Sequence, residues 1–196
     1  MAFFRSLTTD RPPAIEGDGV TLRVPVVADY AEWARLREQS REFLTPWEPV
    51  WPVDDLTRGA FRRRILRYVE DQNNDLSYSF FVFRKEDDVL VGGLTIANIR
   101  RGVAQAGSLG YWMGEPFVGR GHMTAAVRAV APFAFGALAL HRLEAACIPS
   151  NIASSRLLAR CGFVREGLAR EYLCINGKWQ DHLLFARLRD DAARSN

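Results

Sequence analysis

The sequence predicts a single α/β domain in which a mixed, mostly antiparallel sheet is flanked by helices. Strand-like alternation and helix-like periodicity follow one another in the order β-α-α-β-β-β-α-β-α-β-β. The chain has 196 residues, of which 48% are hydrophobic and 25% charged, as expected of one globular domain with a substantial core. No repeat, low-complexity tract or linker interrupts it, so we expect one domain over residues 1–196 with its core at about 15–190.

The first half of the chain supplies one strand, two helices and a hairpin. Residues 20–26 (VTLRVPV) alternate like a strand, and residues 28–40 have the apolar period of a helix. A second helix is expected at 54–72, with acidic residues at its start, where the helix dipole favours them. Strands at 77–84 and 89–99 flank the turn KEDD, which predicts an antiparallel hairpin.

The second half adds two helices and four strands. Gly162 follows the helix at 152–161, at the position where helix C-termini favour glycine. The sequence NGKW favours a tight turn between the last two strands. The other predicted elements are a helix at 121–138 and strands at 107–113, 142–148, 170–175 and 181–188.

Charge does not by itself indicate a nucleic-acid partner. The net charge is only +3, and arginines cluster only at 61–67 (FRRRILR). At helical spacing Phe61, Ile65, Tyr68 and Val69 share one face, so the arginines most simply form a solvated face. A binding patch is the alternative interpretation.

The cysteine and histidine patterns argue against a disulfide-stabilised protein and a metalloenzyme. The three cysteines form no CxxC pair, which suits reduced thiols in a cytoplasmic protein. The three histidines form no HExxH pattern or close His/Cys cluster, so we expect no metal. The initial apolar run is too short for a signal peptide, and no stretch approaches the ~20 apolar residues of a membrane span.

A glycine-rich turn at 115–130 (EPFVGRGHMTAAVRAV) leads directly into the predicted helix. It is not a triphosphate-binding GxxxxGKS/T loop, because Arg120 replaces the lysine and Gly121 the serine or threonine. Thr124 replaces the third glycine of a dinucleotide-binding GxGxxG motif. A helix N-terminus after such a turn presents unpaired N–H groups and suits a pyrophosphate, although the segment could also be a plain strand-to-helix turn.

Three segments resemble the GNAT superfamily of acetyl-coenzyme A-dependent N-acetyltransferases. The turn is similar to motif A, Gln/Arg-x-x-Gly-x-Gly/Ala, with Gly121 at the first glycine, Val118 in the Gln/Arg place and Met123 in the Gly/Ala place. Residues 151–163 (NIASSRLLARCGF) match the NxxSxxLxxxxGF segment. Residues 172–188 (YLCINGKWQDHLLFARL) resemble the terminal hairpin of the ribosomal-protein-alanine N-acetyltransferase (RimJ/RimL-type) branch.

The resemblance implies a GNAT fold and an activity. It implies transfer of an acetyl group from acetyl-CoA to a primary amine, by direct attack in a ternary complex. The implied acceptor is the N-terminal α-amine of a protein, such as a ribosomal protein. A small amine such as a polyamine, amino acid or antibiotic is the alternative, and a non-catalytic acyl-CoA-binding regulatory module is a third. A monomer and a homodimer both remain open.

The resemblance also implies which residues bind acetyl-CoA. A backbone N–H of Trp112 or Met113, where the chain splays after GYW, would polarise the acetyl carbonyl. Asn151 would contact the pantetheine amide and also cap its helix. The main chain from Met113 to Thr124 would cradle the diphosphate, through Val118, Gly119, Arg120, Gly121, His122, Met123 and Thr124.

Two residues are the implied catalysts. Glu171, before the Tyr-Leu pair, would act as base through a water; Glu115 competes for this role, and Glu171 could instead be a surface residue paired with an arginine. Ser154 would donate a proton to the thiolate, because Leu158 occupies the place where many family members have a tyrosine. Ser154 is also an ordinary residue for a helix start.

The acceptor side is implied to come from the loop before the second helix. Residues 43–52 (FLTPWEPVWP) contain three prolines and two tryptophans, which predicts a stiff aromatic loop without regular structure. This loop would form part of the acceptor wall or serve mainly for local packing.

Overall fold

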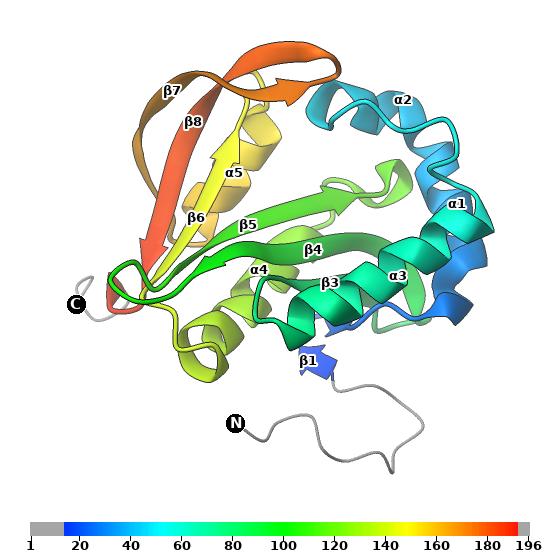
Figure 1. Cartoon of the computed structure of the whole chain (residues 1–196), viewed down its shortest axis with the longest axis horizontal. Helices are drawn as coiled ribbons and strands as arrows, with labels where there is room; N and C mark the ends of the chain where they lie inside the picture. Colours follow the sequence, from blue (N-terminus) through cyan, green and yellow to red (C-terminus); the bar gives the residue numbers. More distant parts are fainter. Residues whose placement is uncertain (1–13, 192–196) are drawn as a thin grey trace.

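A computed structural model of the chain describes residues 14–191, which form one eight-stranded sheet in the order β1-β2-β3-β4-β5-β6-β8-β7 (Figure 1). All neighbouring strands are antiparallel except β5 and β6, which confirms the predicted mixed α/β fold. The strands are β1 (Ala14–Glu16), β2 (Val20–Arg23), β3 (Tyr78–Arg84), β4 (Val89–Arg100), β5 (Ala106–Met113), β6 (Arg142–Cys147), β7 (Val164–Ile175) and β8 (Lys178–Leu188).

Helices cover both faces of the sheet, and each face has its own core. On one face, Trp33 of α1 and Phe61 of α3 pack against Phe81 of β3. On the other face, Val127 of α4 and Leu158 of α5 are completely buried in the larger core. The helices are α1 (Tyr30–Gln39), α2 (Arg41–Leu44), α3 (Arg58–Asn73), α4 (His122–Pro132) and α5 (Ile152–Arg160). None of the helices in residues 14–191 is both long and apolar enough to span a membrane.

Local sequence signals set several of the predicted boundaries. Asn176 and Gly177 both have positive φ, 46° and 76°, so the predicted β7–β8 turn is a two-residue loop of the type that matches strand twist. Gly162 ends α5 with a φ of 79°, as expected for a glycine that follows a helix. Residues 85–88 connect β3 and β4, which confirms the predicted hairpin.

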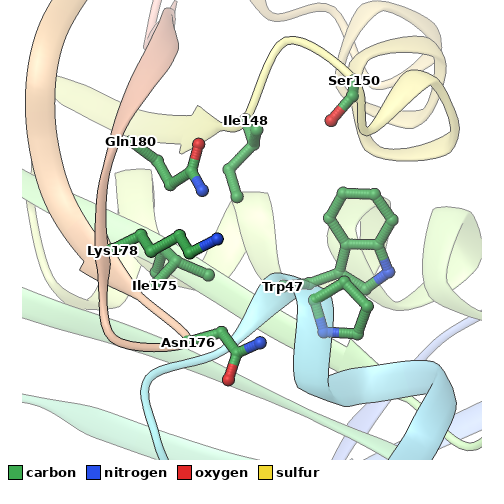
Figure 2. Close-up of a pocket in the computed structure, with 8 residues that line it drawn as sticks. Trp47, Ile148, Ser150, Ile175, Asn176, Lys178 and Gln180 are labelled. Carbon is green, nitrogen blue, oxygen red and sulfur yellow. The ribbon is translucent and has the colours of Figure 1, made fainter.

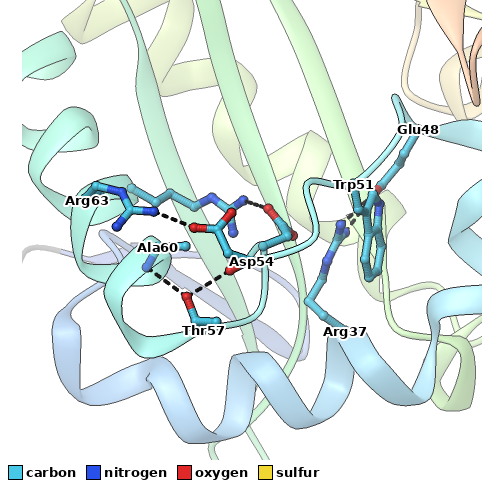
Figure 3. A network of polar contacts seen from close by, with 9 residues as sticks. Arg37, Glu48, Trp51, Asp54, Thr57, Ala60 and Arg63 are labelled. Carbon is cyan, nitrogen blue, oxygen red and sulfur yellow. Dashed lines mark hydrogen bonds and ion pairs between the residues drawn. The ribbon is translucent and has the colours of Figure 1, made fainter.

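The start of α3 differs from the prediction. Thr57 is the N-cap, and its Oγ1 accepts a hydrogen bond from the Ala60 N–H at 3.2 Å (Figure 3). Asp54, expected in the first helical turn, lies before the helix and forms an ion pair with Arg63 at 2.7 Å. The acidic residues before α3 therefore form ion pairs with arginine side chains of the helix instead of occupying its first turn. Val69, placed by its spacing on the packed face, is 48% exposed because the face turned to the sheet is narrower than predicted.

Three further elements correct the sequence-based assignment. The loop at 43–52 contains a short 3-10 helix, Thr45–Trp47, because Pro46 lies in its first turn, where a missing N–H costs no hydrogen bond. The predicted helix at 121–138 is α4 followed by a π-helix at Phe133–Ala137. Strand β7 begins at Val164 instead of 170. Most of its residues are exposed, so its first residues lack the hydrophobic alternation that predicts a strand.

The sheet parts in its middle, between β5 and β6. The two strands pair in register only from Ala106–Arg142 to Ser108–Glu144. Beyond Ser108, β5 pairs only with β4, while β6 pairs only with β8 (Figure 1). The separation was predicted after GYW (110–112), but it begins earlier, directly after Ser108.

Candidate active site

The parted sheet leaves main-chain groups of β5 without a strand partner. Gly114 donates its N–H to the Val91 carbonyl of β4 at 2.9 Å. Alternate residues of an antiparallel strand face opposite sides, so Trp112 also directs its N–H to β4, whereas Met113 directs its N–H into the gap. Of the two residues expected to offer an amide here, only Met113 has its N–H on the open side.

The glycine-rich turn presents a second set of free amides. Gly119 and Gly121 have φ values of 74° and 85°, and a Cβ at either would meet no atom within 4 Å, so backbone conformation is what requires glycine. Gly121 is the N-cap of α4, and the first helical bond runs from Ala125 N to Gly121 O at 3.0 Å. Within residues 14–191 no acceptor binds the N–H groups of residues 119–124.

The side chains of this turn point in different directions. Val118 and Arg120 are exposed, whereas Met123 is buried in the core against β4. Met123 can therefore offer a ligand only its main chain. The Nε2 atom of His122 is buried and has no partner among the described residues. Burial lowers the pKa of His122, and the nearby positive charge of Arg84 lowers it further, so the site favours the neutral imidazole.

Across the gap from β5, the first turn of α5 carries Asn151 and Ser154. Asn151 is the N-cap, as expected, and its Oδ1 accepts a hydrogen bond from the Ser154 N–H at 3.0 Å. Ser154 Oγ lies 2.8 Å from the hydroxyl of Tyr111, a β5 residue that was not among the predicted site residues. Leu158, by contrast, is fully buried and faces the core.

Glu171 lies in an irregular part of β7. The pairing with β8 shifts between Ala169 and Leu173, and Glu171 has a φ of 46°, a conformation in which non-glycine residues are strained. Its N–H donates to Asp181 Oδ1 at 2.9 Å, and its side chain is exposed. With Arg170 and Asp181 it lines an open hollow of about 630 Å³. No ion pair joins Glu171 to a neighbouring arginine in the described part of the chain.

Glu115, the competing carboxylate, lies in a short 3-10 helix at Glu115–Phe117, between β5 and α4. Its N–H donates to Ser40 Oγ at 2.9 Å, and Ser40 is completely buried at the end of α1. The Glu115 side chain is exposed. The main chain of Glu115 thus anchors the start of the glycine-rich turn to α1.

A pocket of about 280 Å³ opens where three separate segments meet (Figure 2). Trp47 comes from the 3-10 helix, Ile148 directly follows β6, and Lys178 begins β8. None of the lining side chains is a carboxylate, so Lys178 makes the pocket positive. The complete lining is Pro46, Trp47, Ile148, Ser150, Ile175, Asn176, Lys178 and Gln180.

The two tryptophans of the aromatic loop have different surroundings. Trp47 lines the pocket, whereas Trp51 donates from Nε1 to Glu48 Oε2 at 2.7 Å and has the Arg37 guanidinium 4.0 Å above its ring (Figure 3). The loop is also tied to the β7–β8 turn, because Asn176 N donates to Glu48 O at 2.9 Å. The loop therefore serves both local packing and the pocket wall.

Known proteins resemble this chain along most of its length. Residues 20–164 match the family model described as Acetyltransferase (GNAT) domain. A probable N-acetyltransferase of Bacillus subtilis, YjcK, is 37% identical over 90% of this chain and 98% of its own length. The ribosomal protein uS5-alanine N-acetyltransferase of Escherichia coli is 33% identical over 94% of this chain and 91% of its own length.

Solved structures agree with these relatives. The ribosomal-protein-S5-alanine acetyltransferase of Vibrio fischeri is 35% identical and superposes with a TM-score of 0.84 over 91% of this chain and 98% of that one. Mycobacterium smegmatis RimJ, solved in complex with CoA-disulfide, is 31% identical, with a TM-score of 0.85 over 91% of this chain and 87% of that one. The family model, the relatives and the fold agree: this chain is an N-acetyltransferase that belongs to the GNAT family, and it is similar to ribosomal-protein-alanine N-acetyltransferases of that family.

Proposed function

We propose that this protein transfers the acetyl group of acetyl-CoA to the N-terminal α-amine of a ribosomal protein. The observation that carries the proposal is the parted sheet, whose free edge leads directly into a turn with unpaired amides. A thioester arm would lie along the unpaired edge of β5, and a diphosphate suits the turn, because a helix N-terminus carries about half a positive charge and several free donors. The relatives named for uS5 or S5 support the choice of acceptor.

The residues present fit this co-substrate. The N–H groups of residues 119–124 would hold the diphosphate, and the buried, unpartnered Nε2 of His122 lies beside them. Acetyl-CoA supplies a thioester whose carbonyl needs a donor, and the Met113 N–H faces the gap where that carbonyl would lie. Asn151 would orient the arm through its amide group while it caps α5.

Two side chains would handle protons. Glu171 would take the proton of the attacking amine through a water, which its exposure and open hollow allow. The demand on this base is modest, because an α-amine has a pKa near 8 and about a tenth of it is neutral at pH 7. Ser154 would donate a hydrogen bond to the departing thiolate from the opposite wall of the gap.

The charge of the pocket favours a peptide N-terminus over a polyamine. A polyamine carries several positive charges, and Lys178 would repel it with no carboxylate in the lining to compensate. A peptide N-terminus brings one weakly basic amine followed by a chain that can lie along Trp47 and Gln180 (Figure 2).

The test is release of free thiol from acetyl-CoA with matched acceptors. Peptides that begin with alanine or serine, the same peptides with a blocked N-terminus and an internal lysine, and a set of small amines are compared. We expect turnover only with free peptide N-termini. Turnover with small amines alone would show that the acceptor is a small amine and not a peptide N-terminus. CoA binding without any turnover would favour a non-catalytic module.

A further inference from the structure

A hydrogen bond between Tyr111 and Ser154 crosses the gap between the two halves of the sheet. Tyr111 belongs to β5, and Ser154 lies on α5, which follows β6 in the chain and packs against it; their oxygens are 2.8 Å apart. Ser154 is the one hydrogen-bond partner of the Tyr111 hydroxyl within residues 14–191. The bond therefore joins the free edge of β5 to the helix that borders the other side of the gap.

The chemistry of the two hydroxyls sets the direction of this bond. Either hydroxyl can donate, but a phenol is a stronger acid than an alkyl hydroxyl and so the better donor, which favours Ser154 as acceptor and keeps its own hydrogen available. Burial raises the pKa of Tyr111 above its ordinary value, so the phenol remains a neutral donor throughout the working pH range. A hydroxyl that accepts one hydrogen bond also donates a stronger one, because the bonds in a chain polarise one another.

We propose that Tyr111 is a positioning residue for the acetyl transfer: its hydroxyl donates to Ser154 and thereby aims and strengthens the hydrogen bond that Ser154 gives to the thiolate of CoA. Leu158, whose side chain cannot donate, faces the core, so a strand tyrosine and a helix serine together provide the polar group at this position. This proposal rests on the proposed function for the role of Ser154. The competing explanation is a purely structural brace: the Tyr111–Ser154 hydrogen bond would only hold the two halves of the sheet together, with no effect on the reaction.

The test compares Tyr111→Phe, Ser154→Ala and the double variant. Tyr78→Phe is the control, since it removes a phenol that bonds Asp75 at 3.0 Å in the same core without touching the gap. The first readout is the titration of the thiol of bound CoA, followed by the ultraviolet absorbance of its thiolate. We expect the acid dissociation constant of that thiol to fall about tenfold in Tyr111→Phe, the effect of weakening one hydrogen bond to a charged group.

The second readout is turnover. With the peptide acceptor, kcat should fall about tenfold in Tyr111→Phe, while the KM for the peptide and the affinity for CoA stay unchanged. Ser154→Ala should have an equal or larger effect, and adding Tyr111→Phe to it should change nothing more, because the two groups act as one unit. Tyr78→Phe should titrate like the wild type.

Three results would overturn the proposal: an unchanged thiol titration in Tyr111→Phe, additive effects in the double variant, or a loss of CoA affinity without a change in titration, as a brace predicts.

If Tyr111→Phe does not fold, replacement of Tyr111 by a fluorinated tyrosine keeps the shape and strengthens the donor. The thiol should then become more acidic than in the wild type, and an unchanged titration would again contradict the proposal. The titration needs no acceptor, so it remains decisive even if every amine proves inactive.

Discussion

Arg37 and Glu48 form a two-point ion pair, with nitrogen–oxygen distances of 2.7 and 2.6 Å, that joins α1 to the loop carrying Trp47. The same guanidinium lies 5.0 Å from the Trp112 ring of β5. One side chain thus connects the wall of the pocket to the strand that borders the gap. This arrangement fixes the position of the aromatic loop before any acceptor arrives.

Breaking this pair should destabilise the fold strongly. Glu48→Gln leaves the Arg37 guanidinium, which is 9% exposed, without a counter-charge, and we expect a loss of about 3 kcal/mol of unfolding free energy. Urea unfolding measures it. Glu38→Gln is the control, because Glu38 is 61% exposed in its pair with Arg41, where solvent screens the charges, and its loss should cost much less stability. Equal effects of the two variants would show that the Arg37–Glu48 pair has no special role.

The two tryptophans of the loop should separate binding from stability. Trp47→Ala removes an aromatic wall of the pocket and should raise the KM for the acceptor peptide about tenfold with little change in melting temperature. Trp51→Ala removes a stacking partner of Arg37 and a donor to Glu48, and should cost about 2–3 kcal/mol of stability. Steady-state kinetics and thermal unfolding of both variants test this difference. A raised KM in Trp51→Ala and a loss of stability in Trp47→Ala would show that the acceptor does not bind in the pocket lined by Trp47.

A methyl group at Gly121 should weaken CoA binding through the backbone alone. The φ of 85° disfavours alanine by about 1–2 kcal/mol, and relief of this strain would turn the amides of the helix start away from the diphosphate. We expect affinity to fall on the order of tenfold by calorimetry. Gly102→Ala is the control, because it carries similar strain at a φ of 63° in the β4–β5 connection. This variant should lose stability but keep its affinity for CoA.

Removal of the carboxylate at position 171 should slow the chemistry and spare co-substrate binding. Glu171→Gln should lower kcat on the order of 100-fold, with an unchanged dissociation constant for CoA. Glu166→Gln, on the same strand but paired with Arg142, serves as the control and should keep full turnover. If Glu115→Gln gives the large effect instead, the base lies in the glycine-rich turn.

Alkaline stability should depend on Tyr78. Burial, aided by the hydrogen bond to Asp75, raises the pKa of Tyr78 to about 12 from its ordinary value of 10.0. The folded state therefore favours the protonated phenol, and this contribution is complete below pH ~10 and is lost as the pH rises to about 12. Urea unfolding at pH 8 and pH 11 should show a smaller loss for Tyr78→Phe than for the wild type, and equal losses would exclude this phenol as the cause.

Features encoded by adjacent residues could be predicted from the sequence. The Asn176–Gly177 turn, the Asn151 cap and the glycine-dependent start of α4 each follow from local backbone chemistry. The start of β7 could not be predicted, because its outer residues are solvated and show no apolar alternation. The pocket was missed for another reason: Trp47, Ile148 and Lys178 meet only through the tertiary fold.

Tyr111 illustrates the same limit within the candidate site. Its partner Ser154 is 43 positions away, and nothing local distinguishes a tyrosine that packs in a strand from one that bonds across a gap. Similarly, alternation along β5 assigns the free amide to Met113 instead of Trp112 only after the pairing with β4 is known.

The separation of β5 from β6 also bears on self-association. Unpaired strand groups on the outside of a sheet invite another molecule to add a strand, which is a common route to aggregation. Here the unpaired groups beyond Ser108 face inward, toward β6. These groups therefore do not lie on the outer edge of the sheet, where a second molecule most readily adds a strand, and the fold keeps a hydrogen-bonding edge for a ligand in its interior.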